Sequence, residues 1–163
     1  MTRAGERLFC DTNVLLSAVD RRRELHAQAL HVLNVLPDRG VALCVSGQIV
    51  REFLVVCTRS VDANGLGLSR PAAVRNAEAI VGRSTVLEEN RGVAVRLLEI
   101  VRTTACTGKR LHDASIVATM QEHGLTRLVT ADPSDFRRFD GVELVDLAEL
   151  PADAAGSGPD GTH

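Results

Sequence analysis

Short apolar runs alternate along this chain with longer segments in which apolar residues recur every three or four positions. The short runs predict strands at residues 8–10, 41–45, 84–87, 127–130 and 142–145. The longer segments predict helices at residues 14–19, 25–36, 47–59, 71–82, 90–103 and 111–123. This alternation is typical of an α/β fold in which helices cover both faces of a parallel sheet.

Turn-forming and capping residues mark several of the predicted boundaries. Pro37 is expected to stop the second helix, and Ser46 can cap the helix that follows the second strand. Asp132 as an N-cap, with Pro133 in the first helical position, predicts another helix after the strand at 127–130. Residues 61–69, which contain an Asn-Gly pair, are expected to form a flexible connection.

The length and composition suit one globular domain. A chain of 163 residues is long enough to bury a real core, and its 45% hydrophobic and 25% charged residues are ordinary for a soluble protein. We assign residues 1–150 to this domain. The tail at residues 151–163 is mostly Ala, Gly, Asp, Ser and Pro, so we expect it to be disordered.

Aromatic content and charge limit the ways in which the chain could hold a nucleic acid. There is no Trp or Tyr and only four Phe residues, so stacking on aromatic rings cannot be the main grip on single-stranded bases. The net charge of -2 argues against a broadly basic surface. The local clusters Arg21-Arg22-Arg23 and Lys109-Arg110 could contact nucleic-acid phosphates, although each alone is equally consistent with a solvated basic face.

Cysteine spacing and the lack of long apolar runs indicate the compartment. The four cysteines have no C-x-x-C spacing, so we expect them to be reduced and structural. No run approaches the eighteen apolar residues of a membrane span, and the first residues have no long apolar segment. The sequence therefore predicts a cytoplasmic protein without a membrane-spanning segment.

Two aspartates directly follow predicted strands. Asp11 ends the first strand, with Thr12 and Asn13 behind it, and Asp132 stands just after the strand at 127–130. Either acid alone could simply cap a helix. Because parallel strands share one carboxyl edge, where open α/β sheets bind ligands, both aspartates are expected at that edge.

Two further acids lie on helices that begin at the same edge. Asp113 occupies an inward-facing position of an apolar stripe at helical spacing, although an acid in a first turn also complements the helix dipole. Glu52 lies on the flank of the helix at 47–59, where an ordinary surface role is the competing interpretation.

Several converging carboxylates predict a cation. Close carboxylates raise one another's pKa unless a positive charge lies between them. Ligation by oxygen alone favours Mg²⁺ or Mn²⁺, and no His or Cys set argues for zinc. Two such ions can activate a water and stabilise both oxygens of an in-line displacement at phosphorus, so the chemistry we expect is phosphodiester hydrolysis.

The ordered motifs of the chain resemble those of the PIN-domain ribonucleases, and in particular the VapC toxins of bacterial type II toxin–antitoxin modules. The resemblance covers roughly residues 7–150 and is more specific than a single motif match. The motifs are Asp11-Thr12-Asn13, Glu52, Gly108 followed by Leu111-His112-Asp113-Ala114, and Thr130-x-Asp132-x-x-Asp135-Phe136.

This resemblance implies a fold, an activity and partners. The fold would be an α/β/α sandwich with a central parallel sheet, and the activity a Mg²⁺- or Mn²⁺-dependent endoribonuclease. The chain would be a homodimer neutralised by a VapB-type antitoxin. By motif, the acidic quartet is Asp11, Glu52, Asp113 and Asp132, with Asp135 as a further metal ligand and with Asn13 and Thr130 as supporting polar groups.

We assign a role to each acid of the quartet. Asp11 is expected to be the central metal ligand, and Asp113 and Asp132 are expected to complete the cage. Glu52 either ligates the metal or orients the attacking water.

Two other classes of protein remain open at the level of the sequence. Phosphatases of the haloacid-dehalogenase kind also place an Asp after their first strand, but their second aspartate, two residues later, is here Asn13. A catalytically silent RNA-binding or scaffold protein on the same fold is the other alternative, which a full set of acids disfavours.

Overall fold

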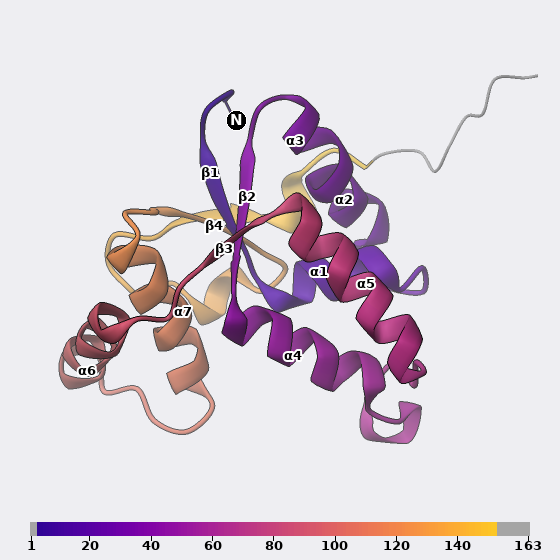
Figure 1. The fold of residues 1–163 in the computed structure, drawn as a ribbon. Helices are drawn as coiled ribbons and strands as arrows, with labels where there is room; N and C mark the ends of the chain where they lie inside the picture. The colour runs from indigo at the N-terminus through magenta and orange to yellow at the C-terminus, as the bar shows by residue number, and fades with distance from the viewer. Residues whose placement is uncertain (1–2, 153–163) are drawn as a thin grey trace, which may run out of the picture.

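A five-stranded parallel sheet forms the centre of the computed structural model, which describes residues 3–152 (Figure 1). The strand order is β3-β2-β1-β4-β5, and every neighbouring pair is parallel. The strands are β1 Arg7–Cys10, β2 Ala42–Ser46, β3 Thr85–Leu87, β4 Arg127–Thr130 and β5 Glu143–Asp146. Phe9 of β1 is paired with Cys44 on one side and Leu128 on the other, so β1 lies in the middle of the sheet.

Helices cover both faces of the sheet, which confirms the predicted α/β/α sandwich. Figure 1 shows α6 and α7 on one side of the strands and α1, α2, α4 and α5 on the other. The α-helices are α1 Thr12–Val19, α2 His26–Leu30, α3 Leu36–Asp38, α4 Gly47–Thr58, α5 Arg70–Arg83, α6 Arg91–Thr104 and α7 Arg110–Glu122. The shorter helical segments are the π-helix η1 His31–Val35 and the 3-10 turns η2 Val61–Ala63, η3 Pro133–Asp135 and η4 Leu147–Glu149.

The middle strands are buried on both faces, as their continuous apolar sequences predict. Phe9, Cys44, Val45, Leu128 and Val129 are all fully inaccessible to solvent. Their burial anchors β1, β2 and β4, so the residues that follow these strands start from a rigid platform.

The prediction that Pro37 stops the second helix is wrong. The helical path continues from α2 through η1 into α3, which contains Pro37. In η1 the N–H of Leu36 bonds to the carbonyl of His31, five residues earlier. The next nitrogen belongs to Pro37 and has no hydrogen to leave unpaired, so the ring is accommodated at the start of a new turn.

Ser46 does not cap α4 through its side chain. It stands at the N-cap position, but its hydroxyl makes no capping hydrogen bond and is buried. The carboxylate of Glu89, from the loop after β3, instead accepts a hydrogen bond of 2.9 Å from the N–H of Gln48. A residue distant in sequence therefore satisfies the first turn of α4.

No α-helix follows β4, although Asp132 and Pro133 predict one. The chain makes only the 3-10 turn η3, and the Asp132 side chain makes no capping hydrogen bond. That side chain instead accepts a hydrogen bond from Asn13. Phe136 and Phe139 are buried just beyond the turn, and their burial holds the chain against the core instead of letting a helix extend.

The segment at 61–69 is tied to the end of α4. Its 3-10 turn η2 ends at Asn64, which has a left-handed backbone conformation with φ of 59°. The N–H groups of Leu66 and Leu68 then bond to the carbonyls of Val56 and Cys57 at 2.9 and 2.8 Å. These bonds fold the segment back onto the helix.

Three further expectations concern the cysteines, membrane-spanning segments and the C-terminal tail. All four cysteines are buried and free, as predicted, and burial raises the pKa of the Cys57 thiol to about 11. Within residues 3–152, no helix is long and apolar enough to cross a membrane. The tail predicted to be disordered falls mostly at 153–163, outside the described residues.

Candidate active site

The carboxyl ends of β1, β2 and β4 lie beside one another, and the first turns of α1 and α4 continue from two of them. Asp11 follows β1 and Thr130 is the last residue of β4. Glu52 lies on α4 and Asp113 lies in the first turn of α7.

Asp11 both caps α1 and occupies the centre of this group. One carboxylate oxygen accepts a hydrogen bond of 2.7 Å from the N–H of Thr12, and the other accepts one of 2.8 Å from the hydroxyl of Thr130. The side chain is buried, and this burial is the main reason that the pKa of Asp11 rises to about 6. The two hydrogen bonds oppose the rise, and the negative charges of Asp113 and Glu52 add to it.

Asn13 and Thr130 connect Asp11 to Asp132. The Asn13 amide donates to Asp132 at 3.1 Å and to the Thr130 hydroxyl at 3.3 Å, and its oxygen accepts from the N–H of Ala131 at 3.0 Å. The Thr130 hydroxyl also accepts a hydrogen bond from the N–H of Asp132 at 3.1 Å. The two predicted supporting residues thus fix the loop after β4 in relation to β1.

Glu52 is held at both of its carboxylate oxygens. One accepts a hydrogen bond of 2.9 Å from the Thr12 hydroxyl, and the other accepts one of 2.9 Å from the side-chain amide of Gln48. The His112 ring nitrogen Nδ1 lies 3.6 Å from the second oxygen, and this imidazole is largely exposed. Glu52 is therefore ordered by neighbours from α1, α4 and α7, which an unconstrained surface glutamate would not be.

Asp113 is half-buried, and its pKa also rises to about 6. Burial contributes most, and the negative charges of Asp135 and Glu52 contribute next. The neighbouring His112 imidazole and Arg110 guanidinium act in the opposite direction. Asp113 therefore faces other acids and does not serve as an isolated first-turn residue.

The structure separates the two acids of the loop after β4. Asp135 is close enough to Asp113 to raise its pKa, whereas Asp132 is hydrogen-bonded to Asn13 on the side of Asp11. Both Asp132 and Asp135 are exposed. All five predicted acids thus belong to one region, with Asp11, Glu52 and Asp113 as its more buried part.

The donor set fits a hard divalent cation. The groups that face the site are carboxylates, hydroxyls and amides, and a positive charge would relieve the repulsion between Asp11, Glu52 and Asp113. In residues 3–152, no group of three or more His, Cys, Asp and Glu side chains is close enough together to hold a metal ion. Mg²⁺ commonly takes one or two protein carboxylates and keeps several waters, so a full cage of side chains is not required for the fit.

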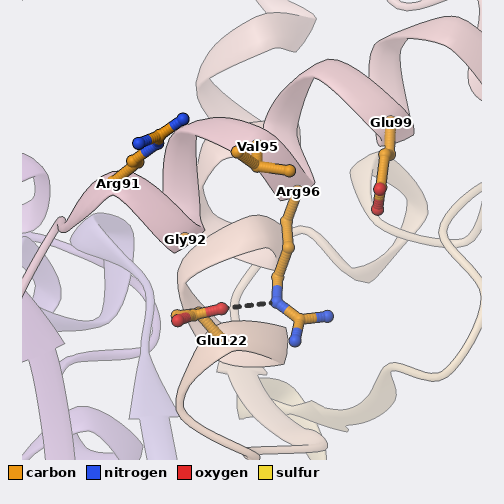
Figure 2. A pocket seen from close by; sticks show the side chains of 6 residues that line it. All are labelled: Arg91, Gly92, Val95, Arg96, Glu99 and Glu122. Atoms are coloured by element: carbon orange, nitrogen blue, oxygen red, sulfur yellow. Dashed lines mark hydrogen bonds and ion pairs between the residues drawn. The ribbon is translucent and has the colours of Figure 1, made fainter.

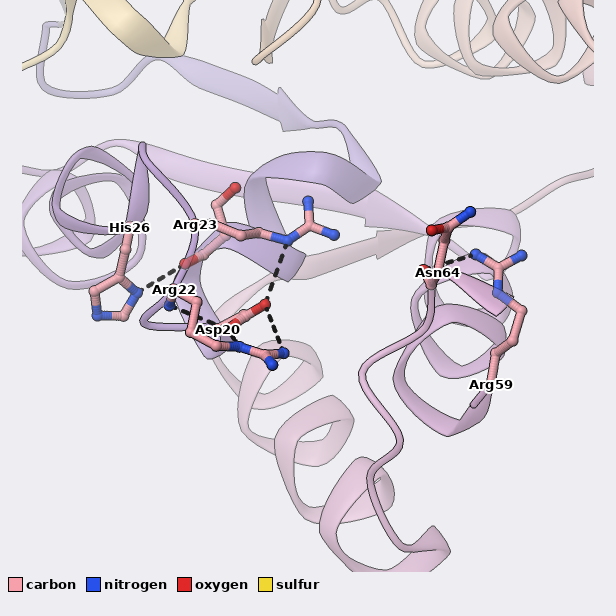
Figure 3. A network of polar contacts seen from close by, with 7 residues as sticks. Asp20, Arg22, Arg23, His26, Arg59 and Asn64 are labelled. Carbon is pink, nitrogen blue, oxygen red and sulfur yellow. Dashed lines mark hydrogen bonds and ion pairs between the residues drawn. The ribbon is translucent and has the colours of Figure 1, made fainter. Parts of the chain in front are cut away.

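The two predicted basic clusters lie at different distances from the acids. Lys109 and Arg110 stand at the start of α7, where the charge of Arg110 lowers the pKa of Asp113. The arginines at 21–23 follow the other end of α1, whose eight residues span about 12 Å. There, Arg22 and Arg23 form ion pairs with Asp20 at 2.9 and 3.8 Å (Figure 3).

Three polar residues of the site had no role assigned from the sequence. They are Thr12, Gln48 and His112. Gln48 is four residues before Glu52, a spacing that puts both on one helix face, and this was the signal that could have found it. Thr12 and His112 adjoin predicted acids, but nothing in their spacing links them to Glu52.

A separate hollow of about 420 Å³ lies between α6 and α7 (Figure 2). Its charged side chains include Arg96 and Glu122, which form an ion pair at 2.7 Å. Gly92 makes room for this pair, because a Cβ atom there would collide with the Glu122 carboxylate. None of the predicted site acids lines this hollow.

Comparison with known proteins identifies a matching family model. The model of the PIN domain matches residues 8–142, a range that contains every acid of the site. No curated protein matches the chain by sequence.

Solved structures with a similar fold include bacterial toxin–antitoxin complexes. VapBC-1 from nontypeable Haemophilus influenzae matches with a TM-score of 0.65 and 18% identity over 88% of this chain and 99% of that chain. VapBC2 from Rickettsia felis, bound to a DNA fragment from its promoter, matches with a TM-score of 0.64 and 13% identity over 86% and 98%. Mycobacterium tuberculosis VapC20, a toxin that cleaves the sarcin-ricin loop, matches with a TM-score of 0.58 and 18% identity over 78% and 92%. At these low identities, the structural similarity establishes a shared fold alone.

Proposed function

This chain belongs to the PIN-domain family, as its motifs predict, and from that premise we propose that it is a divalent-metal-dependent endoribonuclease, the toxin of a type II toxin–antitoxin pair. The observation that carries the proposal is the grouping of Asp11, Glu52 and Asp113 at the carboxyl edge of the sheet. Their mutual repulsion and the raised pKa values of Asp11 and Asp113 favour a bound cation.

The buried and the exposed acids would have different roles in metal binding. Asp11 and Asp113 would hold Mg²⁺ or Mn²⁺, with Asp132 and Asp135 acting directly or through water. When bound, such an ion lowers the pKa of a coordinated water and stabilises negative charge that develops on a phosphate. Thr130 and the N–H of Thr12 favour the ionised form of Asp11, which is the form that binds a cation.

Glu52 would act on the attacking water. Its two oxygens are oriented by Thr12 and Gln48, so its remaining acceptor positions have a fixed direction. A carboxylate held in this way can accept a proton from a water positioned beside a phosphodiester. Asn13 would hold Asp132, in the loop after β4, in place through its hydrogen bond.

The proposed substrate is RNA held by its backbone. Arg110 is close enough to Asp113 to lower its pKa, and both Arg110 and its neighbour Lys109 are exposed, so they would contact the phosphates that flank the cleaved bond. The arginines at 21–23 are a second, more distant candidate surface. Its positive charge is partly neutralised by the ion pairs of Arg22 and Arg23 with Asp20.

We further propose a VapB-type antitoxin as the partner, a homodimer as the assembly and the cytoplasm as the location. The structural similarity to VapBC complexes supports this choice of partner. A cognate antitoxin would be the product of a small adjacent gene.

The purified protein incubated with total RNA provides the direct test. We expect discrete cleavage products with Mg²⁺ or Mn²⁺, and none with EDTA or with the Asp11→Asn variant. RNA that is bound but not cut under any of these conditions would overturn the proposal in favour of a silent RNA-binding protein.

A further inference from the structure

Gln48 is a polar residue buried in the first turn of α4. Its side chain is only 2% exposed. Its amide nitrogen donates two hydrogen bonds, one of 2.9 Å to the carboxylate of Glu52 and one of 3.0 Å to the main-chain carbonyl of His112. A single amide therefore contacts two different helices.

These two contacts connect the parts of the chain that carry the acids. Glu52 lies one turn further along α4, and His112 immediately precedes Asp113 in α7. The amide thus sets the first turn of α7 against the Glu52 carboxylate. The loop after β3 adds a third connection, because Glu89 accepts a hydrogen bond of 2.9 Å from the Gln48 main-chain N–H.

The orientation of the amide is determined by its acceptors. Both neighbours of the nitrogen are oxygens that cannot donate, so exchanging the amide oxygen and nitrogen would place oxygen against oxygen. In the part of the chain that the structure describes, the Gln48 amide oxygen is buried without a hydrogen-bond partner. An apolar residue would avoid that unpaired oxygen, so a polar side chain here is explained by its two N–H groups and not by packing.

We propose that Gln48 is a positioning residue, which fixes the direction of the Glu52 carboxylate and its separation from Asp113. The inference rests on the proposed ribonuclease function. It adds a residue that touches neither substrate nor metal and that acts through Glu52. A group that orients a functional side chain in this way typically affects activity about 10- to 100-fold.

The main test is Gln48→Met, which keeps the length of the side chain and removes both donors. We expect kcat for RNA cleavage to fall about 10- to 100-fold with little change in KM. Gln121→Met is the matched control, because Gln121 is exposed in the last turn of α7, whereas Asp113 lies in the first turn. It should leave both constants unchanged. A purely structural Gln48 would instead lower the unfolding temperature of the Met variant while leaving kcat per folded molecule unchanged, and that result would overturn the inference.

A second measurement needs neither metal nor RNA. In ¹⁵N-labelled, metal-free protein, the side-chain amide signals of Gln48 should shift when Glu52 is changed to Gln, because the acceptor loses its charge. Glu99→Gln, an exposed change on α6, should leave those signals in place. If Glu52→Gln also leaves them in place, the hydrogen bond is absent and the inference is wrong. If wild-type protein cleaves no RNA while the signals shift as expected, the proposed function fails and the positioning of Glu52 by Gln48 stands.

Discussion

The Thr130 hydroxyl donates a hydrogen bond of 2.8 Å to Asp11, so the last residue of β4 holds the acid that follows β1. Because the strands are adjacent and parallel, this bond joins residues that are 119 positions apart in the sequence. It is also the largest influence that lowers the pKa of Asp11 against the effect of burial.

Thr130→Val should therefore raise the pKa of Asp11 further. The substitution keeps the shape of the side chain and removes the donor to a buried charge, which should destabilise the fold at pH 7 by about 1.5 to 3 kcal/mol. Carboxyl NMR titration of metal-free protein measures the pKa, and urea unfolding measures the stability. Thr119→Val is the control, because the Thr119 hydroxyl is buried but bonds only within its own helix. An unchanged pKa of Asp11 in the Thr130 variant would contradict the assignment.

Asp11→Asn should abolish RNA cleavage while leaving the fold intact or more stable. The change removes one of several crowded charges and preserves the shape of the side chain. Cleavage assays and thermal unfolding, run on the same preparation, separate the two effects. Loss of activity together with gross unfolding would mean that Asp11 is a structural residue.

Metal-free wild-type protein should lose stability relative to Asp11→Asn as the pH rises from about 4 to about 6. The folded-state pKa of Asp11 is raised from 3.8 to about 6, so the folded state binds a proton more tightly than the unfolded state in this window. The stabilisation is present in full below the unfolded pKa and is lost as the pH passes the folded pKa. The difference should reach an order of 3 kcal/mol at pH 7. Urea titrations in EDTA at several pH values test this, and a difference that does not vary with pH would refute it.

Asp113→Ala should weaken Mn²⁺ binding more than Asp135→Ala does. Asp113 is half-buried and has a raised pKa, so a cation gains more from its charge than from that of the exposed Asp135. Calorimetric titration of each variant with Mn²⁺ gives the two affinities. The reverse order would show that the acid in the loop after β4 is the principal ligand.

Arg110→Gln should reduce RNA affinity and lower the dependence of log affinity on log salt by about one charge. Arg22→Gln should have a much smaller effect, because Arg22 already forms an ion pair with Asp20 and lies beyond the far end of α1. Fluorescence anisotropy with a labelled RNA, in the presence of EDTA to prevent cleavage, compares the two variants. Equal losses for both would indicate that the substrate reaches across α1.

The strands and helices could be predicted from the sequence because local patterns determine them. Continuous apolar runs mark β1, β2 and β4, which are buried on both faces. The Pro37 error has a local cause, the π-helical turn before it, whereas the errors at Ser46 and Asp132 arise because a residue distant in sequence determines the hydrogen bonding. Glu89 takes the capping role expected of Ser46, and Asn13 binds the side chain of Asp132 that was expected to start a helix. No pattern within a few residues of Ser46 or Asp132 encodes these partners.

Two acids of the candidate site could be placed for a different reason, because the topology of a parallel sheet brings the carboxyl ends of its strands together. Asp11 and Asp132 needed only the parallel sheet to be placed at one edge. The spacing of Gln48 and Glu52 could have placed them on one helix face, but it does not reveal the second contact of Gln48, with the carbonyl of His112, which is 64 residues away. A side chain that acts through another side chain becomes visible only when the three-dimensional contacts are known.

Asp11 is both the cap of α1 and a proposed metal ligand, and this combination has an evolutionary consequence. One of its oxygens satisfies the first turn of α1, so a copy of this gene released from selection for catalysis would still need a cap at position 11. Asn and Ser preserve a cap, whereas apolar residues do not. Among diverged copies that have lost catalysis, substitutions at position 11 should therefore be restricted to small polar residues, while Asp113, which caps nothing, should vary freely.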